Sequence, residues 1–361
     1  MNNNVEVNGI SVVVCCFNSV KKIVKTLDAL SIQQCGLPVA FLVELLIIDN
    51  NSTDGTSAFV QDILKDDFPF PYRIILENNL GKTFALSRGI NESKYKYVCI
   101  VDDDNWLNPD YLYEAWRILE SDKNIGMVGG CGEPALESVA PVWFDTFAIC
   151  YAAAGQAKKS GDLTHTTRFV YGAGSVLRKA AWERIHRAGF KFLLKGNTGN
   201  QLTSGEDNEL CYALIIAGYK IWYSSELRFK HSIGAQRLNW AYIKKLYRAF
   251  AYTAATLMPY TEYFDRVSAG KPSPERIDKP LIWLRIARLR SSYLRSVYDG
   301  TRRDGLLRFK EGGFHSINAM CYVDTISDLI TKQLKKDNSF RQVEKFINQI
   351  NKESKINEES K

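Results

Sequence analysis

The stretch CIVDDDNWLNPDYL, which runs from Cys99 to Leu112, places three consecutive aspartates directly after an apolar run. The residues that lead into it, YKYVCIV, are mostly apolar or aromatic and predict a buried strand. Adjacent carboxylates repel one another, and burying them without partners carries a large desolvation cost. Asp102, Asp103 and Asp104 must therefore face a cation, a ligand or bulk water.

The composition is that of an ordinary globular protein. Its 361 residues are 45% hydrophobic and 24% charged, enough for one large domain with an appendage or for two domains. The eight cysteines form no CxxC pair and no zinc-finger spacing, which indicates a reducing compartment. The N-terminus lacks a signal-peptide pattern, and no apolar run approaches the roughly 20 residues that span a bilayer. We therefore expect a cytoplasmic protein, either soluble or held at the inner face of the membrane.

Apolar runs alternate with segments of helical spacing in the first hundred residues. The predicted strands, which are rich in β-branched residues, are 10–17, 43–50, 72–78 and 95–103. Helices between them predict a parallel or mixed sheet covered on both faces. Such sheets bind ligands beyond the carboxyl ends of their strands, where Asn18, Asp49 and the three aspartates lie in this sequence.

The pattern continues in the middle of the chain and changes near its end. MVGGCGEP predicts a strand, FVYGAGSVLRKAAWERI a strand joined to a helix through a Gly-rich turn, and LTSGEDNELCYALIIAG a helix that starts with two acids. YKIWYSSELRFKHS returns as a strand. From about Trp240, apolar and basic residues interleave at helical spacing, and the tail from Lys335 is polar and charged.

Two interpretations of the acid cluster compete. A solvated turn followed by an acidic helix start is the usual fate of an aspartate run. Carboxylates at a strand end of an α/β sheet instead converge on ligands, and Mg²⁺ and Mn²⁺ prefer carboxylate oxygens and share their shell with phosphates. A metal would also relieve the repulsion among the acids. The sequence therefore favours a site for Mn²⁺ or Mg²⁺ and a phosphate-bearing ligand.

Three other residues of the first half have both a structural and a functional interpretation. Asp49 is either an ordinary helix cap or a contact to a nucleoside. In ENNLGKTFALSRGI, Gly81 permits a close backbone approach, and Lys82 and Arg88 are either solvated cations or neighbours of a diphosphate. With the acid cluster one strand later, a diphosphate contact stays open beside the interpretation as solvated cations.

Charged residues of the second half are open to two interpretations as well. Glu206 and Asp207 fall in a first helical turn, where the helix dipole favours acids, but a second acid there suits a general base. His231 at a strand end is either structural or a metal ligand, and Arg237 is either a phosphate partner or a surface residue.

Two common nucleotide-binding motifs are absent from the sequence. It contains no Walker loop and no GxGxxG fingerprint, so neither a P-loop NTPase nor a Rossmann dehydrogenase is indicated. The Gly-rich YGAGS, from Tyr171 to Ser175, lacks that spacing. Clustered RNA-reading aromatics are also missing, and no nucleic-acid partner is expected.

Taken in order, five segments resemble the family 2 glycosyltransferases of GT-A fold: SVVVCCFN, LLIIDNNSTDGT, NNLGKTFALSRGI, VCIVDDDNWLNPDYL and SGEDNEL. The resemblance implies an α/β fold, with a Rossmann-like mixed sheet and helices on both faces, in residues 1–238. This domain would comprise a nucleotide-sugar-binding half (1–125) and an acceptor-binding half (126–238). A mainly α-helical region (239–361) with a flexible charged tail would follow.

The resemblance also implies an activity. It is the inverting transfer of a sugar, of hexosyl or N-acetylhexosaminyl type, from a nucleotide-diphosphate sugar to an acceptor hydroxyl, with a divalent metal. A UDP-sugar is the expected donor, and a glycan or lipid-linked saccharide of cell-surface polysaccharide or glycoconjugate synthesis the expected acceptor. The basic C-terminal helices suit a peripheral membrane contact near such an acceptor, or a helical subdomain whose basic face is in solvent.

Carried over residue by residue, the resemblance assigns Asp102–Asp104 to the DXD motif. Asp104 would be the principal metal ligand, with His231 as the downstream metal-binding histidine. Asp102 would lie near the ribose or donor sugar, with Asp103 beside it in the donor nucleotide site.

The remaining donor contacts would come from the first three strands and helices. Asp49 would contact the nucleoside base, Phe17 and Asn18 would border it, and Lys82 and Arg88 would lie near the diphosphate. The family often carries ArN in this third-helix motif, where the present chain has Leu-Ser.

In the acceptor half, Asp207 would be the catalytic base and Glu206 would hold the acceptor, with Trp143 expected among the acceptor contacts. AQRLNW resembles the QxxRW motif of processive synthases only loosely, so processive secretion is not expected. Two other functions stay open at this stage. They are a non-catalytic nucleotide-sugar-binding or scaffold protein of the same fold, and a metal-dependent nucleotidyltransferase, which would release pyrophosphate.

Overall fold

The structure is a computed structural model that describes residues 7–33, 36–38, 40–65, 68–196, 203–271 and 338–359. The chain groups into two compact units. The first comprises residues 1–187, 195–201 and 206–238, and the second comprises residues 188–194, 202–205 and 239–361.

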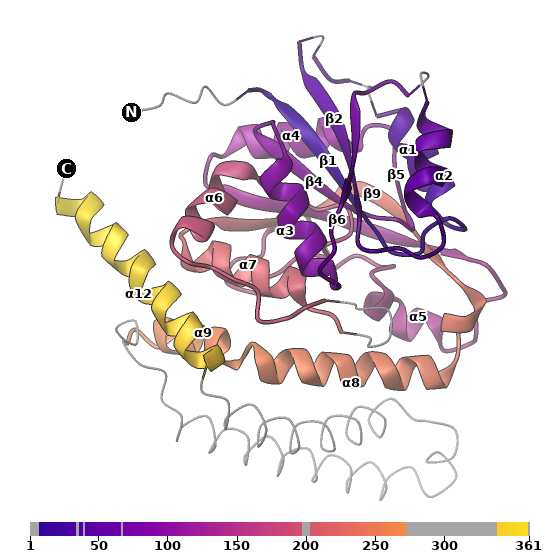
Figure 1. Ribbon diagram of the computed structural model, residues 1–361. Coiled ribbons are helices and arrows are strands. Elements are labelled where there is room, and N and C mark those ends of the chain that lie inside the picture. Colours follow the sequence, from indigo (N-terminus) through magenta and orange to yellow (C-terminus); the bar gives the residue numbers. More distant parts are fainter. Residues whose placement is uncertain are drawn as a thin grey trace, which may run out of the picture. The chain divides into compact units, whose positions relative to one another are not determined.

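Four parallel strands form one half of the sheet in the first unit (Figure 1). β1 (Gly9–Cys16) pairs with β2 (Leu42–Asp49) on one side and with β4 (Tyr97–Asp102) on the other, and β3 (Tyr72–Leu76) pairs with β2. β1 is buried along nearly its whole length, as expected for a β-branched run covered on both faces.

The register of these strands places their polar ends side by side. Cys16 of β1 pairs with Asp49 of β2, and Cys15 pairs with Asp102 of β4. Because the strands are parallel, the loops that follow them leave the sheet at the same edge. The acids predicted as site residues therefore share one edge of the sheet.

The other half of the sheet is mixed. β8 (Val176–Arg178) lies antiparallel between β4 and β6 (Ile125–Leu136), and β6 runs parallel to β9 (Lys220–Ile233). The short strands β5 (Asn105–Leu107) and β7 (Gly161–Asp162) both pair antiparallel with β9. The strand order is β3-β2-β1-β4-β8-β6-β9-β5, with β7 beside β9.

Helices cover both faces of this sheet (Figure 1). On one face, α1 (Ile23–Ser31), α2 (Thr56–Leu64) and α4 (Tyr111–Ser121) share a core with β1, β2 and β4. On the other face, α3 (Lys82–Glu92) packs on β1 and β2, and α7 (Glu206–Ile216) packs on β6 and β9 beside α6 (Lys179–Arg187). A short helix, α5 (Phe144–Phe147), follows β6.

The second unit is helical where the structure describes it. α8 (Trp240–Thr256) begins after Asn239, whose side chain accepts a hydrogen bond from the N–H of Tyr242 at 3.0 Å. α9 (Met258–Ser268) follows directly, and α12 (Asn338–Glu359) packs against it.

The end of the chain differs from the flexible charged tail expected from its composition. Residues 338–359 form α12, in which Val343, Phe346, Ile347 and Ile350 are buried. These apolar residues recur at helical spacing, so they line one face although the segment is polar overall. The ring of Phe346 also lies 5.8 Å from that of Phe190.

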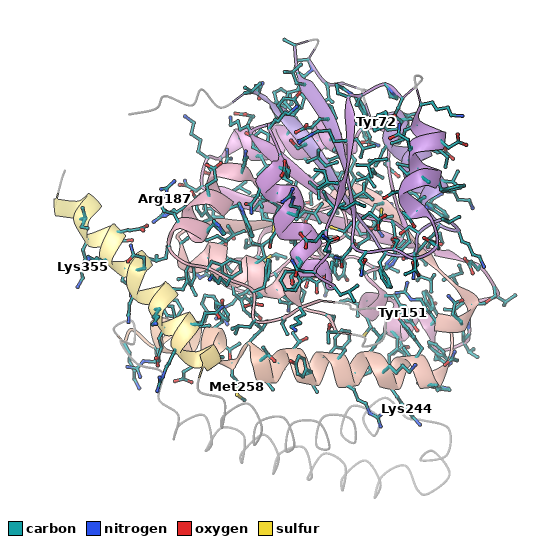
Figure 2. All side chains as sticks on the ribbon, in the orientation of Figure 1. Tyr72, Tyr151, Arg187, Lys244, Met258 and Lys355 are labelled. Atoms are coloured by element: carbon teal, nitrogen blue, oxygen red, sulfur yellow. The ribbon has the colours of Figure 1, made fainter. Side chains whose placement is uncertain are left out.

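The exposed face of α8 is basic. Its apolar residues Ile243 and Leu246 are buried, whereas Lys244, Lys245 and Arg248 are exposed (Figure 2 shows Lys244). A membrane contact through this helix would therefore rest on charge and not on insertion of its apolar face. No helix among the described residues has both the length and the apolar character needed to cross a bilayer.

Gly89→Ala should lower the free energy of unfolding by about 1–2 kcal/mol. A Cβ at Gly89 would lie 2.3 Å from Cγ1 of Val13, so α3 would have to move away from β1. Because this approach is so close, we expect an overpacking cost of about 2–3 kcal/mol, which exceeds the gain of roughly 1 kcal/mol in helix propensity. Ser87→Ala on the same helix is the control and should change stability by less than about 0.5 kcal/mol. Equal stability of the two variants in denaturant titrations would contradict the close packing.

Candidate active site

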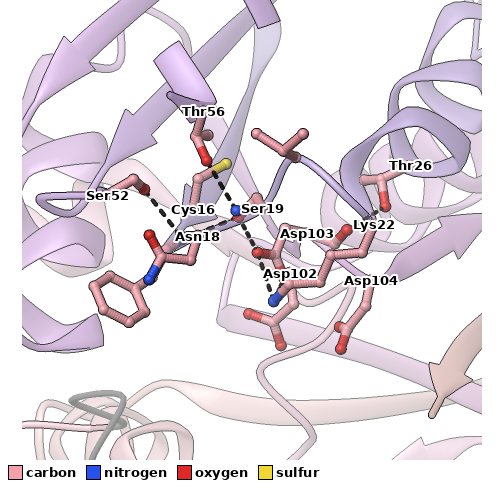
Figure 3. A network of polar contacts seen from close by, with 12 residues as sticks. Cys16, Asn18, Ser19, Lys22, Thr26, Ser52, Thr56, Asp102, Asp103 and Asp104 are labelled. Carbon is pink, nitrogen blue, oxygen red and sulfur yellow. Dashed lines mark hydrogen bonds and ion pairs between the residues drawn. The ribbon is translucent and has the colours of Figure 1, made fainter. Parts of the chain in front are cut away.

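Asp103 is the most buried of the three consecutive aspartates, at 6% exposure. Its carboxylate accepts hydrogen bonds from the Ser19 hydroxyl and, at 2.9 Å, from the Lys22 ammonium (Figure 3). Its carbonyl oxygen accepts one from Thr26 Oγ1 at 3.0 Å. Burial, with the neighbouring charge of Asp104, raises the pKa of Asp103 to about 6 although Lys22 opposes this shift. The carboxylate expected in the donor site thus ties the acidic loop to the start of α1.

Asp102 is paired with a different cation. Lys82 Nζ lies 2.6 Å from Asp102 Oδ1 and 3.3 Å from Glu206 Oε1. Burial would lower the pKa of Lys82, but the two carboxylates outweigh it and hold that pKa well above its ordinary value. The charged Lys82 therefore joins the end of β4 to the first turn of α7.

Asp104 faces a histidine and an arginine. Its Oδ1 lies 3.6 Å from Nε2 of His231, and its Oδ2 lies 3.6 Å from Nη1 of Arg237. Burial alone would raise the pKa of Asp104, but His231, Arg237 and Lys22 outweigh it and hold that pKa well below its usual range. Asp104 is therefore ionised at neutral pH.

His231 is oriented by a backbone group. It is the register partner of Asn105, so β9 brings it beside the acidic loop. Its Nδ1 lies 2.5 Å from the carbonyl oxygen of Tyr151, which can only accept a hydrogen bond. Nδ1 therefore carries the hydrogen, and in the neutral ring Nε2 has a lone pair and lies 3.6 Å from Oδ1 of Asp104. The lone pairs of Nε2 and of the carboxylate oxygen repel each other unless a proton or a metal ion lies between them.

Asp104 and His231 fit a divalent cation in their donor chemistry. A carboxylate oxygen and an imidazole whose other nitrogen is held by a carbonyl are common metal ligands. Within the described ranges, no group of three or more His, Cys, Asp and Glu side chains is arranged to hold a metal. A cation at this pair would therefore take further ligands from substrate phosphates and water.

Asp207 lies in the first turn of α7. Its Oδ2 accepts a hydrogen bond from the N–H of Gly172 at 3.1 Å, and its Oδ1 accepts one from the N–H of Asn208 at 2.8 Å. Burial and the nearby charge of Glu206 raise the pKa of Asp207 to about 6, although Lys82 and these two N–H groups oppose the shift. A carboxylate with such a pKa is a capable general base near neutral pH.

The Gly-rich segment at 171–174 supplies a backbone hydrogen bond to Asp207. We expected a strand before the turn, but the strand of this region, β8, follows it. The backbone N–H of Tyr171 instead donates to the Gln156 side chain at 2.8 Å, and that of Gly172 donates to Asp207. A Cβ at Gly172 would lie 3.3 Å from Cβ of Asp207, so glycine permits the close approach.

The residues predicted for the nucleoside side also gather at this edge. Asp49 is buried, and its carboxylate accepts hydrogen bonds from the N–H of Ser52 at 2.9 Å and from the Ser57 hydroxyl. Asn18 is exposed, with a left-handed backbone (φ 51°), and Phe17 is half-buried beside it. Whether they contact a base remains a prediction.

Two predicted residues are not brought to the acids by any described contact. Arg88 lies six residues beyond Lys82 on α3, and its guanidinium pairs with Glu92 at 3.1 Å. Six residues of helix span about 9 Å. Trp143 precedes α5, where its ring packs edge-on against Phe147 with the centroids 5.8 Å apart.

Several groups around the site were not predicted from the sequence. Lys22 and Ser19 bind Asp103, the Tyr151 carbonyl orients His231, and the N–H of Gly172 binds Asp207. The position of Lys22 in the loop after the first strand was a usable signal, because that loop borders the same edge as the acids. Backbone partners leave no such signal in side-chain identity.

The mixed sheet with helices on its two faces is a GT-A fold. Residues 11–185 match the family described as Glycosyl transferase family 2. The resemblance expected from the sequence is confirmed for this segment of the chain, and so is the expected fold.

Curated relatives match about half of the chain. The poly-beta-1,6-N-acetyl-D-glucosamine synthase of Staphylococcus epidermidis is 28% identical over 182 residues, which cover 50% of this chain and 42% of that protein. The synthase of the same name from Staphylococcus aureus strain COL is 28% identical over 181 residues, which cover 49% and 41%. The matched segment thus spans less than half the length of these relatives.

One solved structure resembles most of the chain. It is S. aureus TarS 1-349 in complex with UDP-GlcNAc, with a TM-score of 0.50 and 16% sequence identity. The match covers 95% of this chain and 89% of that one. At this identity, the likeness bears on the fold alone.

Asp207→Asn should raise the free energy of unfolding at pH 7.5 and leave it nearly unchanged at pH 4. An acid whose pKa is higher in the folded protein than in the unfolded chain costs stability as the pH rises between the two values. For Asp207 that window runs from about 4 in the unfolded chain to about 6 in the folded protein. Because the side chain is partly exposed, the expected gain is about 1 kcal/mol.

Denaturant titrations at the two pH values measure this difference. Asp207→Glu is the matched control, because it keeps an ionisable carboxyl and should keep the loss of stability between pH 4 and 7.5. An equal effect of Asp207→Asn at both pH values would contradict the raised pKa.

Proposed function

We propose that the protein is an inverting glycosyltransferase. It moves a hexosyl or N-acetylhexosaminyl group from a nucleotide-diphosphate sugar to a hydroxyl of a glycan or lipid-linked saccharide. A UDP-sugar is the proposed donor, since the synthases it resembles are named for N-acetylglucosamine and the structural neighbour holds UDP-GlcNAc. Synthesis of a cell-surface polysaccharide or glycoconjugate is the proposed setting.

The Lys82 bridge is the observation that carries this proposal. Lys82 contacts Asp102, at the end of the nucleotide-binding strands, and Glu206, at the start of the helix that bears Asp207. The donor-type acids and the base-type acid therefore belong to one site. A site that gathers both is suited to group transfer from a diphosphate, not to nucleotide binding alone.

The donor would lie along the carboxyl edge of the parallel strands. Phe17, Asn18 and Asp49 would border the nucleoside, and Asp102 the ribose or sugar. Asp104 and His231 would hold Mn²⁺ or Mg²⁺, which offsets the negative charge of a departing nucleoside diphosphate when bound. Arg237 Nη1, 3.6 Å from Asp104, adds a positive charge beside that position.

The acceptor would be activated by Asp207. The acceptor oxygen forms a bond to the anomeric carbon while the bond from that carbon to the diphosphate oxygen breaks. The proton of the hydroxyl passes to the Asp207 carboxylate, and the electron pair leaves with the nucleoside diphosphate. A single displacement of this kind inverts the anomeric configuration. Glu206 would hold the acceptor beside the base, with Trp143 as a further proposed contact.

Asp207→Asn should lower transfer by at least about a thousandfold while donor binding stays within a few-fold of the wild type. The amide keeps the shape of the carboxyl but cannot take the proton. Asp104→Ala should weaken donor binding in Mn²⁺ as well as transfer, because it removes a metal ligand. Calorimetric titration with UDP and Mn²⁺ measures binding, and release of nucleoside diphosphate measures transfer. Full activity of Asp207→Asn would exclude it as the base.

A panel of nucleotide sugars, with and without Mn²⁺, tests the proposed function as a whole. Release of a nucleoside diphosphate from one member of the panel in the presence of an acceptor is the expected result. Release of pyrophosphate would instead identify a nucleotidyltransferase. Binding without turnover across the panel and a set of acceptors would identify a non-catalytic protein of the same fold.

A further inference from the structure

Hydrogen bonds fix the backbone at the start of α3, whose first residue is Lys82. Gly81, which precedes the helix, has φ 134°, and its N–H donates to the Asn50 side chain at 2.8 Å. The N–H of Thr83 donates to the carbonyl oxygen of Lys195 at 3.3 Å, and a Cβ at Gly81 would lie 2.7 Å from that oxygen. The backbone on both sides of Lys82 is thus fixed by groups of the same unit.

Glu206 depends on Lys82 for its charge partner. The residue is 8% exposed, and among the described residues Lys82 is the cation within 4 Å of its carboxylate. Its second oxygen, Oε2, is buried and has no hydrogen-bond partner. A buried carboxylate with one pair and one unmatched oxygen is costly, so loss of Lys82 would leave a nearly isolated charge beside Asp207.

The charged and titratable groups around Asp207 come from three segments. Glu206 precedes it on α7, and Lys82 on α3 acts on it with the opposite sign. Tyr171 of the Gly-rich segment interacts with it electrostatically, and so do Cys211 and Tyr212 of α7. Of these, Lys82 is the cation, and it also holds the anion that opposes ionisation of Asp207.

We propose that Lys82 is a positioning residue of the transfer reaction. Its ammonium pairs with both Asp102 and Glu206. In this way it holds Glu206, the proposed acceptor contact, in place and favours the ionised form of Asp207, the proposed base. This role goes beyond a contact to the diphosphate, and it rests on the proposed function of Asp207 as the base. Through Lys82, the end of β4, which carries Asp102, is linked by ion pairs to the start of α7, which carries Glu206 and Asp207.

Removal of the Lys82 charge should raise the pKa of Asp207. Lys82→Met takes away a cation that favours the ionised form and leaves Glu206 unpaired, so we expect a rise of about one pH unit. The acid limb of kcat/KM should move to higher pH by the same amount. Lys82→Arg keeps the charge and should restore both values toward the wild type. A residue that served stability alone would lower activity equally at every pH.

Glu206→Gln closes the test. Glu206 raises the pKa of Asp207, so this substitution should lower it, and the double variant with Lys82→Met should return it toward the wild-type value. If Lys82→Met alone does not fold, the comparison of Glu206→Gln with the double variant gives the effect of Lys82. In that background, removal of the cation should again raise the pKa of Asp207.

The decisive measurement is a titration of the Asp207 carboxyl by carbon-13 NMR in the substrate-free protein. The resonance is assigned by its loss in Asp207→Asn. A higher pKa in Lys82→Met that is reversed in Lys82→Arg supports the proposal. An unchanged pKa in Lys82→Met, or the same shift in Lys82→Arg, overturns it. Because this titration needs no substrate, its outcome is separate from that of the nucleotide-sugar panel, which tests the proposed function.

Discussion

Mutual repulsion among three adjacent carboxylates is the constraint on which the site depends. Each carboxylate faces a different group: Asp102 pairs with Lys82, Asp103 pairs with Lys22, and Asp104 lies 3.6 Å from both Arg237 and His231. Neighbouring side chains at a strand end point in different directions, which makes this separation possible. These contacts offset part of the repulsion, beside any metal ion that the site binds. Of the three, only Asp104 lies beside a histidine nitrogen, Nε2 of His231, whose lone pair can bind a cation.

The fold supplies these partners from distant parts of the chain. Lys22 follows β1, Lys82 begins α3, and His231 lies on β9, opposite Asn105 of β5. Each arrives because the carboxyl ends of parallel strands and the starts of the following helices share one edge of the sheet. Burial at this edge disfavours the ionised forms of Asp103 and Asp207, and it raises the pKa of each to about 6. Perturbed pKa values of this kind are common at active sites.

The sequence predicted the fold well because the determining signals are local. Buried β-branched runs such as that of β1 and the helical spacing between them are visible without an alignment, and the order of five motifs indicated the family. The acids could be predicted for the same reason, since strand ends are recognisable. The tail was mispredicted because Val343, Phe346, Ile347 and Ile350 form a stripe that composition averages away.

The placement of Arg88 and the separate duties of the aspartates could not be predicted. Both depend on which way a side chain points once its backbone is fixed. Arg88 has the right charge in the right motif, but the helix carries it about 9 Å past Lys82 and toward Glu92. The N–H of Gly172 and the carbonyl of Tyr151 bind through the backbone, so their identity as residues says little about their role.

The account rests on the claim that the three aspartates have distinct duties and that only Asp104 meets a metal. Anomalous diffraction from crystals grown with UDP and Mn²⁺ measures this directly. We expect one manganese peak, bonded to the carboxylate of Asp104 and to Nε2 of His231, with Asp103 still bound to Ser19 and Lys22. A peak coordinated by Asp103, or a manganese ion without His231 among its ligands, would contradict the account.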